Sequence, residues 1–215
     1  MAKSTSSKRW LREHFDDPWV RRARDEGWRS RAVYKLEEIA GRDRIFHRGQ
    51  TIVDLGAAPG GWSQWCAARL GPATCLIALD ILPLEPLPGV TFIQGDFTEQ
   101  AACDALCAAL DGRWADVVLS DMAPNISGLK AIDAPRAMAL SELAAEFAAA
   151  HLKPGGTLLV KAFQGAGFDR LCAALRVQYD KVAVRKPRAS RPRSPELYLL
   201  ARGLRDDRRA LSPND

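Results

Sequence analysis

The chain has 215 residues, of which 47% are hydrophobic, and it carries a net charge of +5 at pH 7. This length fits one α/β domain with short terminal extensions, and the apolar content excludes disorder as the overall state. No apolar run approaches the ~18 residues that a membrane span needs, and the N-terminus lacks the apolar core of a secretory signal. The cytoplasm is therefore the expected location, and the positive charge favours an anionic partner.

The basic residues concentrate in two segments, residues 8–35 and residues 181–193, while the middle of the chain is close to neutral or acidic. The two segments can close onto one face of the molecule and follow a phosphate backbone. The alternative is that they form two separate, solvated charged surfaces. The charge pattern alone leaves both interpretations open.

The five cysteines form no C-x-x-C pair, and the three histidines are scattered along the chain, so no metal site is predicted. Each cysteine lies among alanines or aliphatic residues, which predicts buried, reduced side chains rather than ligands or disulfides. Cys103 and Cys107 lie one helical turn apart, in phase with Leu106 and Leu110. We therefore expect both thiols on the buried face of a helix.

In chain order, the first predicted unit is a polar, basic extension over residues 1–28, which includes Trp10, Trp19 and Trp28. It is either a flexible arm that orders on a partner or a short helix that packs its tryptophans on the domain. Apolar residues then recur at helical spacing from Ser30 to Ile39, which predicts a helix with Ser30 as its N-cap.

Seven strand-like runs follow, and helix-like runs separate most of them. The strand-like runs are Thr51–Leu55, Cys75–Leu79, Val90–Ile93, Val117–Leu119, Thr157–Val160, Val182–Val184 and Leu197–Leu200. Ala101–Leu110 and Ala139–Leu152 are the clearest helical runs. This alternation predicts a mostly parallel, doubly wound α/β sheet. The last two runs are joined only by a loop, so they are predicted to pair antiparallel.

The most informative motif is DLGAAPGGWSQ, residues 54–64, which directly follows the first strand-like run. A strand, a glycine-rich turn and a helix N-terminus form a site where backbone N–H groups meet a ligand's polar end. Gly56, Gly60 and Gly61 allow positive φ and a close approach of the backbone to that ligand. The turn has the pattern G-x-x-P-G-G, and Pro59 fixes its shape, so a nicotinamide or flavin cofactor is disfavoured.

Three further residues are predicted near this turn. Asp80 ends the second strand, where a carboxylate can accept hydrogen bonds from both hydroxyls of a ribose. Asp96 ends the third strand, where it can accept from an adenine amino group or can instead cap the next helix. Trp62 can shield the ligand or pack its helix onto the sheet. All of them fall at strand carboxyl ends, where open α/β sheets bind ligands.

Five segments, in order, resemble the FtsJ/RrmJ (RlmE) family of S-adenosylmethionine-dependent ribosomal RNA ribose 2′-O-methyltransferases. They are SRAVYKL (30–36), DLGAAPGGWSQ (54–64), LSDMAPN (119–125), LKPGGTLLVKAFQG (152–165) and RPRSPELY (191–198). The similarity runs from about Trp28 to Arg202. It implies a Rossmann-like methyltransferase fold over residues 29–203, with a seven-stranded, mostly parallel sheet and an antiparallel edge hairpin. A charged tail is expected over residues 204–215.

The resemblance also implies which residues form the site. The K-D-K-E tetrad of the family falls on Lys35, Asp121, Lys161 and Glu196, and its cofactor contacts fall on Gly60, Trp62, Asp80, Asp96 and Asp121. A ribose 2′-hydroxyl is a weak acid, whereas a sulfonium methyl group is already activated. The enzyme must therefore align the two and remove a proton.

A free lysine has a pKa near ~10.4 and is a poor base at neutral pH, but a second cation and partial burial lower that pKa. We therefore assign Lys161 as the proton acceptor, with Lys35 as the neighbouring cation that positions the 2′-oxygen. Asp121 is expected to hold Lys161, and Glu196 is expected to hold Lys35 or the substrate.

The substrate that the resemblance implies is a uridine ribose in the A-loop of large-subunit ribosomal RNA, on assembled or nearly assembled large subunits. A monomer without a metal is expected. RNA loops are read by stacking and shape, so the basic segments and the N-terminal tryptophans are candidates for recognition. Two alternatives stay open: 2′-O-methylation of the tRNA anticodon loop, and an RNA-binding ribosome-assembly factor with a vestigial site. A nicotinamide oxidoreductase is disfavoured by the glycine turn.

Overall fold

The computed structural model describes residues 17–125, 128–191 and 193–206. Its strands are β1 (Thr51–Leu55), β2 (Cys75–Asp80), β3 (Val90–Gln94), β4 (Ala115–Ser120), β5 (Leu152–Phe163), β6 (Tyr179–Arg185) and β7 (Glu196–Leu204). Its helices are α2 (Pro18–Asp25), α3 (Val33–Asp43), α4 (Gly61–Leu70), α5 (Gln100–Leu110), α6 (Lys130–His151) and α7 (Phe168–Gln178). Each of the seven predicted strands is present, longer than its apolar run in most cases.

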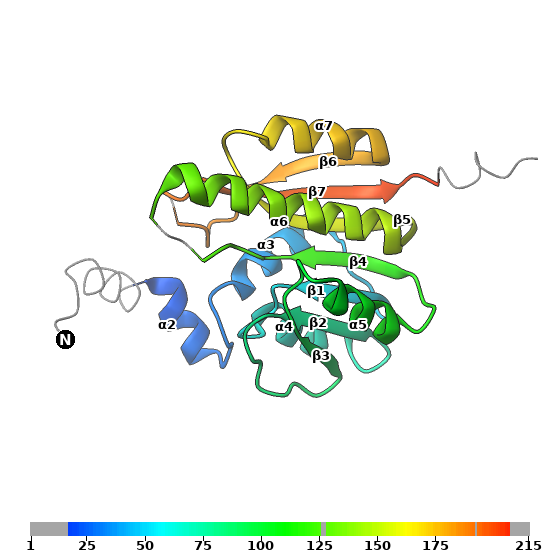
Figure 1. Ribbon diagram of the computed structural model, residues 1–215. Helices are drawn as coiled ribbons and strands as arrows, with labels where there is room; N and C mark the ends of the chain where they lie inside the picture. Colours follow the sequence, from blue (N-terminus) through cyan, green and yellow to red (C-terminus); the bar gives the residue numbers. More distant parts are fainter. Residues whose placement is uncertain (1–16, 126–127, 192, 207–215) are drawn as a thin grey trace, which may run out of the picture.

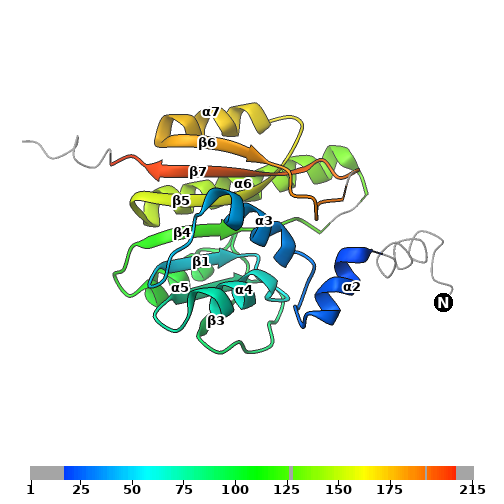
Figure 2. The ribbon, with the colours of Figure 1, turned by 180° about the vertical axis from the view of Figure 1, so that it is seen from behind.

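The strands form one sheet in the order β3-β2-β1-β4-β5-β7-β6. The pairs from β3 through β5 are parallel, whereas β7 runs antiparallel to both β5 and β6. Helices cover both faces: α5, α6 and α7 lie on one side, and α3 and α4 lie on the other (Figures 1 and 2). The predicted α/β class and the antiparallel edge hairpin are therefore confirmed.

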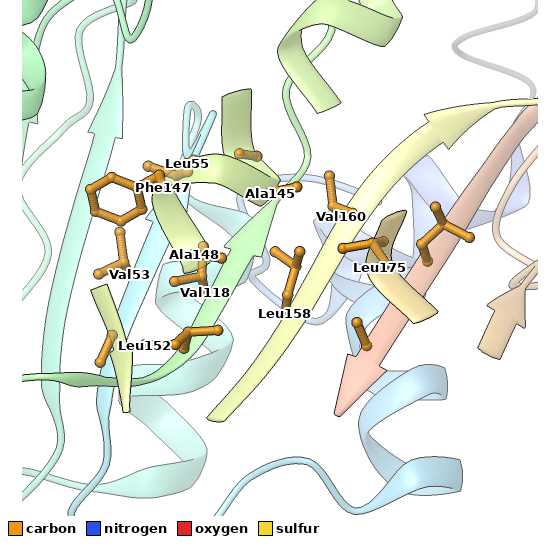
Figure 3. Close-up of a cluster of buried hydrophobic side chains, with 14 of the residues drawn as sticks. Val53, Leu55, Val118, Ala145, Phe147, Ala148, Leu152, Leu158, Val160 and Leu175 are labelled. Carbon is orange, nitrogen blue, oxygen red and sulfur yellow. The ribbon is translucent and has the colours of Figure 1, made fainter. Parts of the chain in front are cut away.

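The core between the sheet and α5, α6 and α7 is made of aliphatic side chains from the central strands. Val53 and Leu55 on β1, Val118 on β4 and Val160 on β5 are buried in one cluster with Phe147 of α6 (Figure 3). Strands that are covered on both faces carry nearly continuous apolar runs, and β1 is buried at every position. This packing fixes the carboxyl ends of β1, β2, β4 and β5, which carry the polar residues of the site.

The start of α3 differs from the prediction. Its N-cap is Ala32, without a side-chain cap, so the assignment of Ser30 as the N-cap was wrong. The Ser30 hydroxyl instead occupies the space that a side chain at residue 61 would need, which explains why Gly61 begins α4. Ser30 thus packs against the start of α4 and does not cap the N-terminus of α3.

All five cysteines are free thiols, but only Cys66 and Cys172 are buried as predicted. Cys75 and Cys103 are half-buried, and Cys107 is exposed. The buried face of α5 is formed by Ala102, Leu106 and Leu110, and Cys103 lies only at its border. Because a helix rotates by about 100° per residue, Cys107 is turned to the outer side of this face. Its sulfur lies 3.6 Å from Nε2 of His151.

Helix α2 lies at the end of the sheet where the parallel strands finish (Figure 2). Its Ala23 is buried, and the Trp19 ring packs on Tyr34 of α3 with 5.1 Å between centroids. For residues 18–25 the helical alternative is therefore correct, whereas Trp10 lies outside the described residues. Within the described ranges, no helix combines the length and apolar character that crossing a membrane requires.

Candidate active site

A cavity of about 460 Å³ opens at the carboxyl ends of β1, β2 and β4. Backbone from the glycine turn, the residues after β2 and β3, and the segment after β4 surround it. Its lining includes Gly56, Ala58, Asp80, Ile81, Leu82, Asp96, Phe97, Asp121, Met122 and Pro124. The cavity thus combines carboxylates with an apolar wall, as is typical of small-molecule sites.

Asp80 is fixed by two backbone N–H groups. Its Oδ2 accepts from Ala58 N of the glycine turn at 2.8 Å, and its Oδ1 accepts from Leu82 N at 2.8 Å. Each carboxylate oxygen has a further lone pair, so both can still accept from ligand hydroxyls. Asp80 therefore lines the cavity and also holds the glycine turn to the end of β2.

Asp96 also lines the cavity. Its Oδ1 accepts from the Thr98 backbone N–H at 2.9 Å and from the Thr98 hydroxyl at 2.7 Å. These hydrogen bonds lower the pKa of Asp96, so the group is ionised at neutral pH. Since Glu99 is the N-cap of α5, Asp96 does not cap that helix.

Two of the predicted cofactor residues do not line the cavity. Gly60 is the N-cap of α4 with φ of 103°, and a side chain there would meet Arg29 and Leu87. Trp62 is buried, and its Nε1 donates to the Ala32 carbonyl at 2.7 Å. Trp62 thus holds the glycine turn against the start of α3, and Gly60 lies close to Arg29 and Leu87, while Gly56 and Ala58 of the same motif face the cavity.

The tetrad is brought together beside this cavity in two ion pairs. Lys161 Nζ lies 2.9 Å from Asp121 Oδ1 and donates to the Asp121 carbonyl at 2.5 Å. Lys35 Nζ lies 2.9 Å from each of the two Glu196 carboxylate oxygens. Lys35, Lys161 and Glu196 expose only 8%, 7% and 9% of their surfaces, and charged residues reach such burial only when they are paired.

Two hydroxyl groups that sequence reasoning did not assign complete this arrangement. Ser190 Oγ donates to Glu196 Oε1 at 2.7 Å. The Tyr198 hydroxyl donates to Asp121 Oδ1 at 2.5 Å and accepts from Lys35 Nζ at 3.1 Å. A signal for Tyr198 was present in the sequence, because residues two apart on a strand share a face, and Tyr198 is two residues after Glu196.

The charges of the site act on one another. Burial alone would raise the pKa of Asp121, but the positive charges of Lys161 and Lys35 outweigh it and hold that pKa below its usual value. Burial, together with the negative charge of Asp121, raises the pKa of Tyr198 well above that of a free phenol. At neutral pH the site therefore contains an ionised Asp121 beside a neutral Tyr198 hydroxyl.

Within the described ranges, no three His, Cys, Asp or Glu side chains are grouped so that they could hold a metal ion. The tetrad and its neighbouring hydroxyl groups can form hydrogen bonds, stabilise charge and transfer protons next to a cavity of small-molecule size.

Comparison with known proteins identifies the family. Residues 28–204 match the model of the FtsJ-like methyltransferases. A Hydrogenovibrio crunogenus protein named Ribosomal RNA large subunit methyltransferase E is 59% identical, over 94% of this chain and 98% of its own length. A protein of the same name from Pseudomonas aeruginosa is 55% identical, over 96% of this chain and 100% of its own.

Among solved structures, a Plasmodium falciparum protein described as a ribosomal RNA methyltransferase has a TM-score of 0.73 and 27% identity. That match covers 82% of this chain and 98% of the other. Human methyltransferase-like protein 13, with a TM-score of 0.52 and 14% identity, has a similar fold over 80% of this chain and 77% of its own. The family and fold predicted from the motifs are confirmed, and with them S-adenosylmethionine as the cofactor. The chain belongs to the FtsJ-like methyltransferase family.

Proposed function

We propose that this protein transfers a methyl group from S-adenosylmethionine to the 2′-oxygen of a uridine ribose in the A-loop of large-subunit ribosomal RNA. The observation that carries the proposal is the position of Asp121, which lines the cavity and also pairs with Lys161 at 2.9 Å. A single side chain thus connects a cofactor-sized cavity with a buried pair of lysines. The names of the relatives support ribosomal RNA as the substrate.

The cavity fits the cofactor in size and in the chemistry of its lining. Asp80 and Asp96 are carboxylates that suit ribose hydroxyls and an adenine amino group, and Ile81 and Leu82 offer apolar surface to a base. At Gly56 a Cβ would collide with Met122, so the absence of a side chain lets the segment after β4 approach the glycine turn closely where both line the cavity. When bound, the cofactor supplies an electrophilic methyl group on a sulfonium centre.

The residues of the chain then have to remove the proton of the 2′-hydroxyl and position its oxygen. Lys161, held by Asp121, is the proton acceptor for the 2′-hydroxyl. Lys35, held by Glu196, positions the 2′-oxygen and stabilises its developing negative charge. The contacts with Asp121 and Glu196 restrict both lysine Nζ atoms to one geometry, and Lys161 accepts the proton as the neutral amine. Such positioning is the main contribution that an enzyme can make to this reaction.

The same site supports three further expectations. The cavity and all four tetrad residues come from one chain, which supports a monomeric enzyme. We expect it to act in the cytoplasm on large subunits that are assembled or nearly so. The exposed Arg188 and the basic side chains of α2 lie on segments next to α3, which suits contact with an RNA backbone.

The test is incubation with methyl-labelled cofactor and three RNAs: large subunits that lack 2′-O-methylation, naked 23S-type ribosomal RNA, and bulk tRNA. Label on the ribose of an A-loop uridine in subunits is the expected result. Label on tRNA alone would overturn the substrate, and cofactor binding without label would favour an RNA-binding assembly factor.

Lys161→Ala tests the assigned proton acceptor. This variant should lose turnover while it retains cofactor binding, since Lys161 does not line the cavity. The matched control is Lys153→Ala, which removes an exposed lysine from the opposite, amino-terminal end of the same strand, β5, and should leave turnover unchanged. Near-normal turnover by Lys161→Ala would contradict the assignment.

A further inference from the structure

The hydroxyl group of Tyr198 joins the two ion pairs of the site. It accepts a hydrogen bond from Lys35 Nζ at 3.1 Å and donates one to Asp121 Oδ1 at 2.5 Å. Lys35 belongs to the pair with Glu196, and Asp121 belongs to the pair with Lys161. The five side chains therefore form one continuous chain of polar contacts with the phenol at its centre.

The position of the phenol is set by the sheet rather than by the polar contacts themselves. Tyr198 is fully buried on β7, and it lies directly opposite Lys161 in the antiparallel register with β5. Its ring packs on Trp62 with 5.8 Å between centroids. Because β7 is paired on both sides, a rigid element holds this hydroxyl in place.

The hydrogen bond to Asp121 affects how that carboxylate acts on its lysine. Asp121 Oδ1 receives both the Lys161 ammonium group and the Tyr198 hydroxyl. A donor on the same oxygen takes up part of the negative charge, so less of it acts on Lys161. Without that donor, the carboxylate would hold a proton on Lys161 more strongly, and a protonated lysine cannot accept another.

We propose that Tyr198 is a positioning residue of the methyl-transfer site. Its hydroxyl fixes Lys35 relative to Asp121, and it limits the strength with which Asp121 retains a proton on Lys161. This inference rests on the proposed function above, and it assigns no bond making or breaking to the phenol.

The other charged groups around these atoms remain in place when the hydroxyl is removed. Asp121 is faced by Lys35 from α3, by Lys161 from β5 and, through space, by Asp54 from β1. Tyr198 is faced by Glu196 on its own strand and by Arg31 from the segment before α3. A change in pH dependence on loss of the hydroxyl therefore reports on the hydroxyl itself.

The test compares Tyr198→Phe with Tyr179→Phe in the full-length protein, with large subunits that lack the modification as substrate. Tyr179 is the matched control, because it is a buried tyrosine on β6 whose hydroxyl has no hydrogen-bond partner among the residues that the structure describes. For Tyr198→Phe we expect kcat to fall about 10- to 100-fold with an unchanged KM for the cofactor. The ascending limb of its kcat–pH profile should move to higher pH, and Tyr179→Phe should behave like the parent.

Parental kcat and an unshifted profile in Tyr198→Phe would overturn the inference. A parent and a Tyr179→Phe variant that both fail to methylate ribosomal RNA would overturn the proposed function, and this inference with it. If Tyr198→Phe does not fold, 3-fluorotyrosine at position 198 replaces it, since this residue keeps the ring and is a stronger donor. The ascending limb should then move to lower pH, and an unmoved limb would overturn the inference.

Discussion

Arg29 donates a hydrogen bond from Nη1 to the carbonyl oxygen of Glu85 at 2.6 Å, across 56 residues of sequence. The same guanidinium donates to the Pro86 carbonyl at 3.0 Å and to the Pro59 carbonyl at 3.3 Å. Arg29 therefore ties the segment before α3 to the glycine turn and to the loop after β2. That loop begins with Ile81, which lines the cavity.

We expect Arg29→Ala to weaken S-adenosylmethionine binding about tenfold, because the loop loses the hydrogen bonds that hold it beside the cavity. Arg29→Lys should recover little of this loss, since an ammonium group cannot reproduce the planar fork of a guanidinium. Titration calorimetry without RNA measures the effect. Arg24→Ala, which removes an exposed arginine of α2, is the control. Equal affinities in all four proteins would show that the loop does not depend on Arg29.

The contacts of Arg29 also show what the sequence could and could not predict. The strands were predictable because buried strands have continuous apolar runs, and the tetrad was predictable because its residues lie in recognisable motifs. The acceptors of Arg29 are backbone carbonyls, which carry no signal of residue type. The role of Tyr198 depends on the register between β5 and β7, which motifs do not specify. Gly60 and Trp62 were predicted to contact the cofactor because they lie in the glycine-rich motif. The motif does not specify which of its residues face the cavity, and these two do not line it.

A substitution at Gly56 tests the close approach between the glycine turn and the segment after β4, both of which line the cavity. A Cβ at this position would lie 2.9 Å from both the backbone N and the Cα of Met122, and backbone atoms cannot move aside as a flexible side chain can. Gly56→Ala should therefore displace the segment that carries Asp121 and Met122, and it should greatly weaken cofactor binding.

Gly155→Ala is a matched control for this steric effect. Gly56 and Gly155 have φ of 76° and 79°, but a Cβ at Gly155 would have no atom within 4 Å. Both variants carry the cost of a left-handed backbone, about 1–2 kcal/mol, and only Gly56→Ala adds the collision. Thermal unfolding and calorimetric cofactor binding separate the two contributions. Similar loss of cofactor affinity in both variants would contradict the steric explanation.

Asp54 should make the stability of the protein depend on pH. It is 2% exposed, its Oδ2 accepts from Ser63 Oγ, and its Oδ1 has no hydrogen-bond partner within the described residues. Burial raises the pKa of Asp54 to about 7. In the unfolded chain the same group has a pKa near ~3.9.

The sign of the effect follows from these two values. Below about pH 4 the Asp54 carboxyl is protonated in both the folded and the unfolded protein, so it contributes no pH dependence to the unfolding free energy. Between about pH 4 and 7 the unfolded state releases its proton while the folded state keeps it, so the unfolding free energy falls by up to ~1.4 kcal/mol per pH unit. Above about pH 7 this loss is complete.

Asp54→Asn removes this titration. The unfolding free energy of the variant minus that of the parent should therefore rise between pH 4 and 7 and then level off, as measured by urea denaturation. The difference between the proteins matters here, because other groups also titrate in this range. A constant difference from pH 4 to pH 8 would show that Asp54 is ionised in the folded protein.

The last prediction concerns two ion pairs with the same separation and different burial. Arg185 and Asp43 lie 2.6 Å apart with side-chain exposures of 14% and 11%, and they join β6 to the end of α3. Arg170 and Glu142 also lie 2.6 Å apart, but their exposures are 76% and 34%. The Arg185 guanidinium makes two hydrogen bonds to Asp43, which hold the pKa of that carboxyl below its usual value.

Arg185→Ala should lower the free energy of unfolding by about 2–4 kcal/mol, because it leaves a poorly solvated carboxylate without its partner. Arg170→Ala should change it by less than ~1 kcal/mol, since water replaces the lost contact at an exposed site. Urea denaturation at pH 7 measures both. At a pH low enough to protonate Asp43, the loss in Arg185→Ala should shrink, because the remaining carboxyl is then neutral. Equal losses for the two variants at pH 7 would show that burial does not decide the strength of these pairs.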